Sequence, residues 1–371
     1  MSMRRRSLTF ALFCATGSAA TAAHGQTAGR HPDPRFIDRG IAPTSTVRLA
    51  DLSTSAPLRF HGEPLVSLGK EDGPPEVVFG EITAAAFTPT GSLAILDGSQ
   101  NEVRVFGQNG ALRQRFGRAG SGPGEFDHPK GLAVAPDGSI VVSDLSRSLQ
   151  RFQQTPAGYR PQVRRQWGIR LRSLCATDMG LFVNGLQPGD PRTVRFFRSD
   201  SAPPAAFAPL YNSPNPAVND QFGEVRLACD SQAGAVFLMP NGSIGEVRAY
   251  RQDGSPLWRT IVTDFQANTI LDRPQGYEVT LNAAGVNSGL SLTFVASIGL
   301  VAQIAYRSAA ALKAGDTSIA TIYTLILDPK TGQLRDGGQG VPRIAAAQGS
   351  LVMIIQDDPA PRVEVRRVAP R

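Results

Sequence analysis

Six short repeats punctuate this chain of 371 residues. In each repeat, an apolar run leads to a polar turn that contains glycine, and a second apolar run follows. Two such runs around a turn glycine predict a β-hairpin, because glycine adopts the positive φ that tight hairpin turns require. A chain that repeats this pattern six times is expected to repeat one small folding unit. The turn glycines are Gly91, Gly138, Gly180, Gly234, Gly299 and Gly349.

A second hairpin follows the first in each unit. In the first repeat it comprises 102–106 and 111–116, and in the fourth repeat 246–250 and 257–262. Each unit is therefore predicted to be a four-stranded antiparallel meander. Repeats of about 40 to 50 residues with four strands apiece are typical of blades packed radially around an axis. The sequence thus predicts an all-β fold, a six-bladed β-propeller.

The sixth repeat lacks one strand of its blade. It offers only three strands within 344–368, and the fourth is predicted near the N-terminus. There, residues 65–76 match 114–125, which form the outer strand and linker of the next repeat. A strand within 57–69 should therefore complete the last blade. Closing the ring in this way removes the exposed edges that an open array would leave.

The first two repeats align residue for residue, with 86–97 matching 133–144. The segment 116–144, which includes Gly-Ser-Gly-Pro-Gly-Glu-Phe and Ala-Pro-Asp-Gly-Ser, resembles the NHL repeats of many bacterial six-bladed propellers. The later repeats keep mainly the turn glycine and the apolar runs. The resemblance implies the fold. Propellers of this kind serve as binding platforms and, less often, as lyases or lactonases, so function has to be argued from the site.

The N-terminal segment has the features of an export signal. Three arginines at positions 4–6 precede a short apolar stretch, and the small residues near 22–25 suit a signal peptidase. We interpret 1–25 as a signal peptide, 26–56 as a flexible leader and 57–371 as the propeller. The protein is then exported, to a periplasm or out of the cell, by the general secretory or the twin-arginine route. No transmembrane segment is predicted.

The charge of the chain is mild once the signal is removed. Cleavage takes away three arginines and no acidic residue, which lowers the formal charge from +7 to +4. Such scattered charge on an exported protein argues against a nucleic-acid partner. A group of arginines is interpreted as a solvated outer blade face, with contact to anionic glycans or lipids as the alternative. The group is Arg160, Arg164, Arg165, Arg170 and Arg172.

Two cysteines lie in the predicted ring, Cys175 and Cys229, each five residues before a turn glycine. They should occupy equivalent places on the innermost strands of neighbouring blades. An oxidising compartment permits a disulfide between them. Equivalent positions on adjacent blades can also lie beyond the roughly 7 Å between Cα atoms that a disulfide tolerates. Two packed core thiols are therefore the alternative.

Polar residues at strand ends are the candidate ligand-binding residues. Two aspartates occupy the same repeat position, six residues after the turn glycine, and two asparagines lie nearby in the next two blades. We expect these strand ends and the inter-blade linkers to surround one mouth of the central channel. There they would bind a cation or a polar ligand, or accept backbone N–H bonds as a structural alternative. The set is Asp97, Asn101, His128, Lys130, Asp144, Asn184 and Asn241.

Catalytic motifs are scarce in this sequence. Only His61 and His128 fall within the predicted ring, too few for a three-histidine zinc site, and no Gly-x-Ser-x-Gly elbow is present. We expect a non-enzymatic, monomeric module that binds a protein, peptide or glycan through one face, without a metal or cofactor. The alternative is a metal-dependent lactonase- or lyase-type enzyme with calcium or another divalent cation at the channel.

Overall fold

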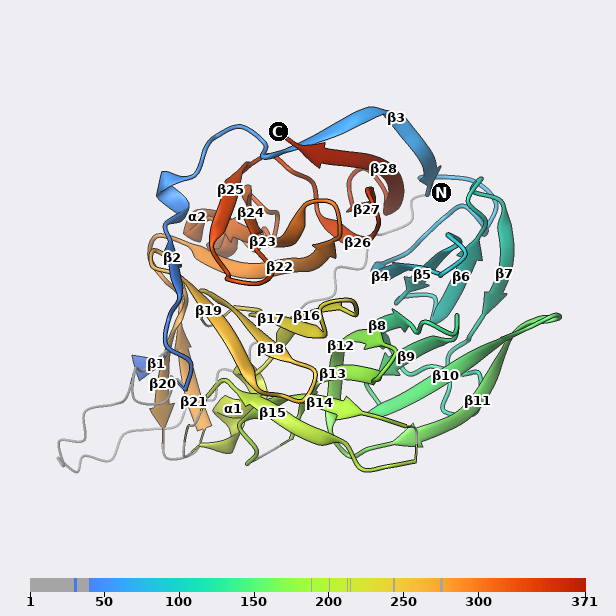
Figure 1. Cartoon of the computed structure of the whole chain (residues 1–371), viewed down its shortest axis with the longest axis horizontal. Helices are drawn as coiled ribbons and strands as arrows, with labels where there is room; N and C mark the ends of the chain where they lie inside the picture. Colours follow the sequence, from blue (N-terminus) through green and yellow to red (C-terminus); the bar gives the residue numbers. More distant parts are fainter. Residues whose placement is uncertain are drawn as a thin grey trace.

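A computed structural model describes residues 30–31 and 40–371, except 188, 200, 212, 214, 243, 274 and 275. Six sheets, each built on four antiparallel strands, are arranged around a central axis (Figure 1), which confirms the predicted six-bladed β-propeller. The predicted signal peptide, 1–25, lies outside the described residues. Within them, no helix combines the length and apolar character needed to cross a membrane.

Each blade is built on four strands that follow one another from the channel outward, the innermost first. Blade one contains β4 (Ile82–Phe87), β5 (Leu93–Asp97), β6 (Glu102–Phe106) and β7 (Leu112–Phe116), and blade two contains β8 (Pro129–Val134), β9 (Ile140–Asp144), β10 (Ser148–Thr155) and β11 (Gly158–Gln166). Blade three contains β12 (Arg170–Thr177), β13 (Gly180–Leu186), β14 (Arg192–Phe197) and β15 (Ala205–Pro209), and blade four contains β16 (Val225–Asp230), β17 (Ala235–Pro240), β18 (Glu246–Arg251) and β19 (Pro256–Val262). Blade five contains β22 (Val286–Val295), β23 (Gly299–Arg307), β24 (Thr321–Leu327) and β25 (Leu334–Gln339), and blade six contains β26 (Ile344–Gln348), β27 (Leu351–Gln356), β28 (Arg362–Pro370) and β3 (Leu58–Leu68).

The inner hairpin of every blade turns at the glycine that marks its repeat. All six turn glycines have positive φ, from 61° at Gly349 to 146° at Gly180. Side chains other than glycine adopt such angles only at a cost, which explains why glycine marks each repeat. Each innermost strand contacts the innermost strand of the next blade, and β26 contacts β4. The six inner strands therefore form a closed ring around the channel.

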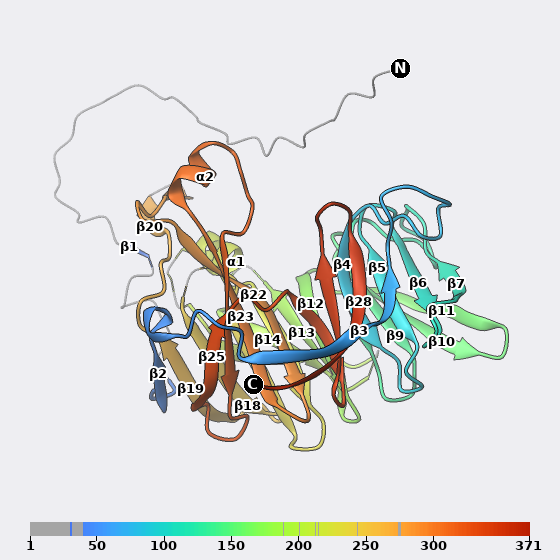
Figure 2. The same ribbon diagram turned by 90° about the horizontal axis from the view of Figure 1, so that it is seen from above.

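The closing strand lies where the sequence predicts it. β3 pairs with β28 in antiparallel register, with Leu68 opposite Val363 and Leu58 opposite Pro370. Figure 2 shows β3 running along β28. Strands from the two ends of the propeller thus share one sheet, so that closure needs no second chain.

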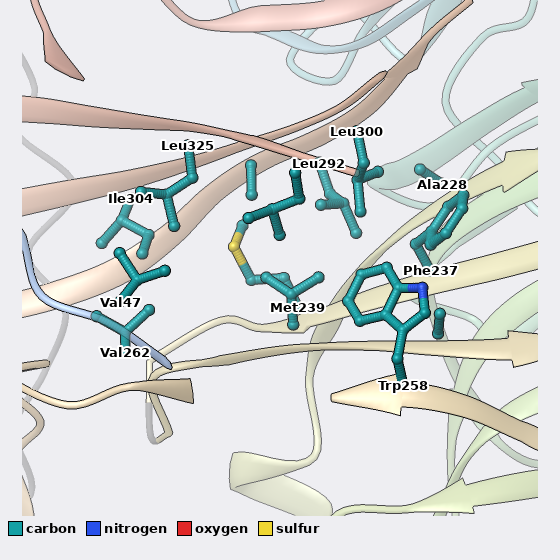
Figure 3. Close-up of a cluster of buried hydrophobic side chains, with 14 of the residues drawn as sticks. Val47, Ala228, Phe237, Met239, Trp258, Val262, Leu292, Leu300, Ile304 and Leu325 are labelled. Carbon is teal, nitrogen blue, oxygen red and sulfur yellow. The ribbon is translucent and has the colours of Figure 1, made fainter. Parts of the chain in front are cut away.

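The core lies between the blades. In the cluster between blades four and five (Figure 3), Phe237 and Trp258 of blade four pack with Leu292 and Leu300 of blade five. The indole N–H of Trp258 donates to the carbonyl of Pro329 at 2.9 Å, so its one polar group is satisfied. Burial of apolar surface between neighbouring sheets is therefore what holds the blades together.

Part of the predicted leader has a regular structure, contrary to expectation. β2 (Ser45–Val47) pairs in parallel with β19 and adds a fifth strand to blade four. A short 3₁₀ helix, Leu49–Asp51, follows it, and its backbone N–H groups at Leu49 and Ala50 donate to the carboxylate of Asp264 at 2.8 and 3.0 Å. Val47 and Leu49 are buried in the core cluster of blades four and five. A three-residue strand has no periodicity to detect, so the sequence did not predict it.

Three insertions lie at the end of the ring where the inner strands begin, which we call the linker face. They are the helix α1 (Pro216–Phe222), the helix α2 (Ala309–Lys313), and a hairpin of β20 (Thr269–Arg273) and β21 (Gly276–Thr280) that also pairs with β1 (Arg30–His31). Figure 2 shows α2 and β20 projecting from the same side of the ring. The segment before α1 contacts the hairpin, because the Asn215 side chain donates to the carbonyl of Gly276 at 2.8 Å. The insertions thus build up the linker face of the propeller.

Candidate functional site

The carboxylates of Asp97 and Asp144 are engaged within the ring. Asp97 is fully buried and accepts N–H bonds from Gly80 at 2.9 Å and from Gln100 at 3.1 Å. Asp144 accepts the N–H of Asp127 at 3.3 Å, which is the corresponding contact in blade two. Gly80 and Asp127 belong to the linkers that enter these blades. Both aspartates therefore anchor a linker to the second strand of its blade. Of the two interpretations given for this pair from the sequence, ligand binding and acceptance of backbone N–H bonds, these contacts correspond to the second.

Two side-chain amides perform the same task between later blades. Asn184 is fully buried, donates to the carbonyl of Gly223 at 3.1 Å and accepts the N–H of Val225 at 3.2 Å. Gln303 in blade five accepts the N–H of Ile344, the first residue of β26, at 2.7 Å. Each amide follows its turn glycine by four residues. Counting from that glycine would have identified Gln303, which was not among the residues predicted from the sequence.

We expect chelation of divalent cations to leave the melting temperature unchanged. The carboxylates of Asp97 and Asp144 already accept N–H and O–H bonds, and no three His, Cys, Asp or Glu side chains in the described part of the chain gather closely enough to hold a metal ion. Thermal melts with and without EDTA, paired with elemental analysis, test this. A bound ion would stabilise the folded state by mass action. A fall of more than about 3 °C that added calcium restores would favour the metal-dependent alternative.

The structure separates the remaining residues predicted at the channel mouth. His128 is exposed, and its backbone N–H donates to the side-chain oxygen of Asn101 at 3.0 Å. These two residues contact each other outside the central cavity, whereas Lys130 lines that cavity. Asn241 is not among the residues that line the cavity, but its side-chain N–H donates to the carboxylate of Glu224, which does line it, at 3.3 Å. Lys130 is therefore the predicted residue that reaches the channel directly.

The central channel contains a cavity of about 340 Å³ at the linker face, which we call the channel cavity. Residues of the innermost strand, or of the segment just before it, line it from all six blades, and none of these lining residues is aromatic. Its charged lining residues are Glu81, Lys130, Arg172, Glu224, Arg226 and Arg343. We call the four basic ones, Lys130, Arg172, Arg226 and Arg343, the channel cations. Because it draws on every blade, this cavity is the candidate site.

The repeat pattern explains how the channel cations come together. Lys130, Arg172 and Arg226 each lie eight residues before the turn glycine of their repeat, so they occupy equivalent places on neighbouring inner strands. Arg343 lies six residues before its turn glycine, directly before β26 begins. A count of charges at one repeat position would have found three of the four. Of these cations, Lys130 alone was predicted from the sequence as a ligand-binding residue.

Two of the channel cations are paired with a carboxylate. Glu224 lies between them, 3.7 Å from the Nε of Arg172 and 3.8 Å from a terminal nitrogen of Arg226. Asn241 supports this arrangement by donating to Glu224 and accepting from Arg226, each at 3.3 Å. The Nε of Arg172 and the Nε of Arg343 are both buried and meet no hydrogen-bond acceptor among the described residues. One carboxylate thus lies near two arginines, while the Nε atoms of Arg172 and Arg343 have no acceptor.

The arginines that line the cavity influence one another's pKa. Burial lowers the pKa of Arg226, Glu224 raises it and the nearby Arg172 lowers it further. Burial also lowers the pKa of Arg343, the positive charge of Arg226 adds to this effect, and the carboxylates of Asp357 and Glu81 oppose it in part. A guanidinium stays charged at neutral pH despite such shifts. The cavity therefore carries positive charge that its own carboxylates do not neutralise.

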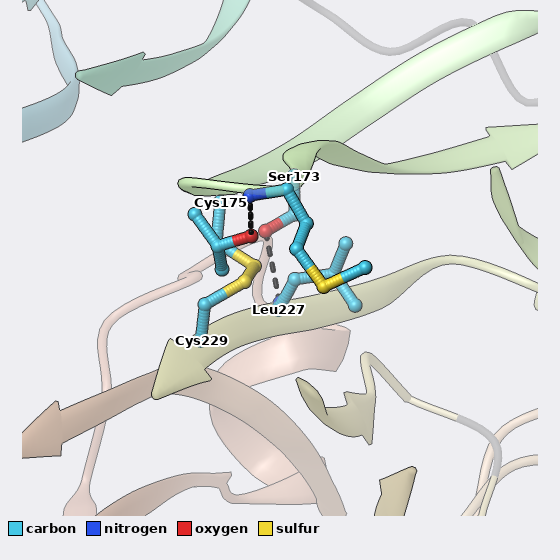
Figure 4. The surroundings of a disulfide bond; sticks show 6 residues. Ser173, Cys175, Leu227 and Cys229 are labelled. Atoms are coloured by element: carbon cyan, nitrogen blue, oxygen red, sulfur yellow. Dashed lines mark hydrogen bonds between the residues drawn. A yellow bond between two sulfur atoms is a disulfide. The ribbon is translucent and has the colours of Figure 1, made fainter. Parts of the chain in front are cut away.

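A disulfide lies next to the cavity wall. Cys175 of β12 and Cys229 of β16 are bonded, with their Cα atoms 5.8 Å apart. Figure 4 shows the bond beside a hydrogen bond in which the N–H of Leu227 donates to the hydroxyl of Ser173 at 2.9 Å. Each cysteine follows one of the channel cations by three residues. The bond therefore fixes the spacing of the two strands that carry Arg172 and Arg226.

The arginine group interpreted as an outer blade face does not form one surface. Arg160 and Arg165 are exposed on β11, the outermost strand of blade two, as expected. Arg164 instead turns inward and donates to the carboxylate of Asp144 at 2.6 Å. Arg172 lies on the innermost strand of blade three and lines the channel cavity. Alternation along a strand sends neighbouring side chains to opposite faces, which separates residues that are adjacent in sequence.

Comparison with solved structures finds the same architecture at very low sequence identity. A putative exported protein from Bacteroides fragilis has a TM-score of 0.50 and 10% identity, over 88% of this chain and 99% of that chain. A member of the DUF4221 family from Bacteroides vulgatus has a TM-score of 0.54 and 9% identity, over 85% of this chain and 99% of that chain. No protein-family model and no curated protein matches the chain. Structural similarity at such low sequence identity shows a shared fold and no more.

Proposed function

We propose that this protein is an exported, monomeric β-propeller that binds a protein, peptide or glycan at its linker face, with one residue or end group of the ligand entering the channel cavity. The observation that carries the proposal is the cavity itself, which is lined from all six blades and is polar and charged. Its volume of about 340 Å³ lies within the range of small-molecule sites. The space suits one sugar or amino-acid residue and excludes a whole folded domain.

The architecture around the cavity supports a ligand that extends beyond it. α1, α2 and the β20–β21 hairpin stand on the same face as the cavity, so a chain entering the channel would have surface to contact outside it. Functional residues commonly lie on such connections, which a rigid scaffold positions. Because one chain supplies all six blades and closes the ring, the site is complete in a monomer.

Export and ancestry are part of the proposal. The basic and apolar character of residues 1–25 supports export, and the Cys175–Cys229 disulfide fits an oxidising compartment. The aligned segments 86–97 and 133–144 support descent from NHL-type repeats. In this proposal the protein is a binding module that needs no cofactor, and its destination is a periplasm or the cell exterior.

A substitution that fills the cavity tests this proposal. Thr83 lines the channel cavity, and Thr83→Trp would occupy it, whereas Thr90→Trp places the same side chain on the exposed inner turn of the same blade. We expect ligands found on glycan and peptide arrays to lose at least about tenfold in affinity for the Thr83→Trp protein. The Thr90→Trp protein should bind them as the unmodified protein does. Ligands that bind both variants equally would place the site elsewhere.

A further inference from the structure

Four cations from four different blades converge on the channel cavity. Lys130 comes from blade two, Arg172 from blade three, Arg226 from blade four and Arg343 from the entrance to blade six. Opposed to them are the carboxylates of Glu81 and Glu224. The lining of the cavity thus carries two more positive than negative charges. Long-range repulsion makes such an arrangement unfavourable unless another anion is present.

The carboxylates of Glu224 and Glu81 are not placed equally close to all four channel cations. Glu224 is shared by Arg172 and Arg226 at 3.7 and 3.8 Å, distances too long for strong hydrogen bonds. Glu81 is exposed, and together with Asp357 it attracts the charge of Arg343. Among the described residues, neither carboxylate accepts a hydrogen bond from the Nε of Arg343.

Two guanidinium donors in the wall lack acceptors. The Nε atoms of Arg172 and Arg343 are buried and form no hydrogen bond with any described residue. Buried polar groups in native proteins almost always have a partner, and an unpaired charged donor is the most costly exception. Arg172 and Arg343 both line the channel cavity. An anion in the cavity would therefore lie next to the positive charge of both side chains.

Building on the proposed function, we infer that the channel cavity binds an oxyanion with about two negative charges, held by Arg343, Arg226, Arg172 and Lys130. Phosphate, sulfate and dicarboxylate groups share this chemistry. Planar guanidinium groups recognise such oxygens through paired hydrogen bonds, and an ammonium adds an undirected charge. The lack of aromatic residues in the lining fits recognition by charge rather than by stacking on a neutral ring.

Calorimetric titration at low ionic strength tests this inference with three probes: inorganic phosphate, sulfate and succinate. We expect one site per chain, with affinity that falls as salt is added. Arg343→Gln should weaken the preferred probe at least about tenfold, because it removes a charged donor from the anion. Arg165→Gln removes the same charge from the exposed outer strand of blade two and should change the affinity less than about twofold. A preference for phosphate and sulfate over succinate would identify a tetrahedral group, and the reverse a dicarboxylate.

The stability of Arg343→Gln separates ligand binding from a structural role. Without added anion, this variant should melt at the same temperature as the unmodified protein or higher, since it removes a buried, incompletely paired cation. Added phosphate or sulfate should raise the melting temperature of the unmodified protein and not that of the variant. A lower melting temperature for the variant without anion would instead assign Arg343 to the structure of the ring.

Three outcomes would overturn the inference. They are the lack of binding of all three probes at millimolar concentration, equal binding by the Arg343→Gln and unmodified proteins, and an equal loss in the Arg165→Gln protein. The proposed function and the anion inference can be told apart. If Thr83→Trp abolishes the binding of an array ligand and Arg343→Gln leaves that binding unchanged, the ligand binds in the channel cavity but is not recognised as an anion.

Discussion

A protein with serine at positions 175 and 229 is expected to lose about 4 kcal/mol of its free energy of unfolding, from the loop-closure entropy of the disulfide. Cys175 and Cys229 are 54 residues apart in sequence, so the bond restricts a long loop in the unfolded chain. It also joins the innermost strands of blades three and four beside the channel cavity. Urea unfolding of the double variant and the unmodified protein measures the difference.

Reduction supplies the control for this experiment. The unmodified protein treated with a reductant should unfold at nearly the same urea concentration as the double serine variant, and the reductant should not affect the variant itself. A double variant as stable as the oxidised protein would show that the bond does not form, or that it strains the native ring by as much as it restricts the unfolded chain. Thiol titration of the unfolded protein decides between these two explanations.

Glu246→Gln is expected to destabilise the protein by about 3 to 5 kcal/mol, because it leaves two buried guanidinium groups without their counterion. The Glu246 side chain is 0% exposed and accepts hydrogen bonds from the Nε atoms of Arg248 and Arg259, both at 2.7 Å. Those side chains are only 1% and 7% exposed. Glutamine preserves the shape of the side chain but not its charge. The measurement is the midpoint of urea unfolding, with circular dichroism to show that the variant still folds.

The repeats provide matched controls for Glu246. In blade one, Glu102 pairs with the buried Arg104 and with Arg115, whose side chain is 38% exposed. In blade six, Glu364 pairs with Arg366, which is 25% exposed, and water can reach that pair. We therefore expect the losses to fall in the order Glu246→Gln, Glu102→Gln, Glu364→Gln, the last below about 1 kcal/mol. Equal losses in the three variants would show that burial of the arginines does not set the cost.

Local signals made the propeller predictable. Each turn glycine has a conformation that other residues avoid, and each hairpin forms between segments only a few residues apart, so the pattern is visible in short stretches of sequence. The closing strand β3 could be placed because its sequence matches that of an outer strand elsewhere in the chain. The anchoring role of Asp97 and Asp144 was foreseen as an alternative, since their position recurs at the end of a second strand.

Elements that depend on contacts with residues far away in the sequence were harder to predict. β2 owes its existence to β19, more than 200 residues later, and three residues carry no pattern of their own. The β20–β21 hairpin has no counterpart in the other repeats, so the comparison of repeats passes over it. Gln303 anchors β26 as Asn184 anchors β16, but the difference in residue type concealed the equivalence. In each case tertiary contacts, rather than local preference, decide the structure.

The sequence by itself determined the number of blades, the turns and the strand that closes the ring, because these depend on backbone preferences repeated at short range. Only the tertiary structure decided where the charge of the chain gathers. Lys130, Arg172, Arg226 and Arg343 are scattered over more than 200 residues, and they become neighbours when the inner strands of the closed ring lie side by side. Electrostatic interaction depends on distance in space and on exclusion of water, and neither exists until the ring has closed.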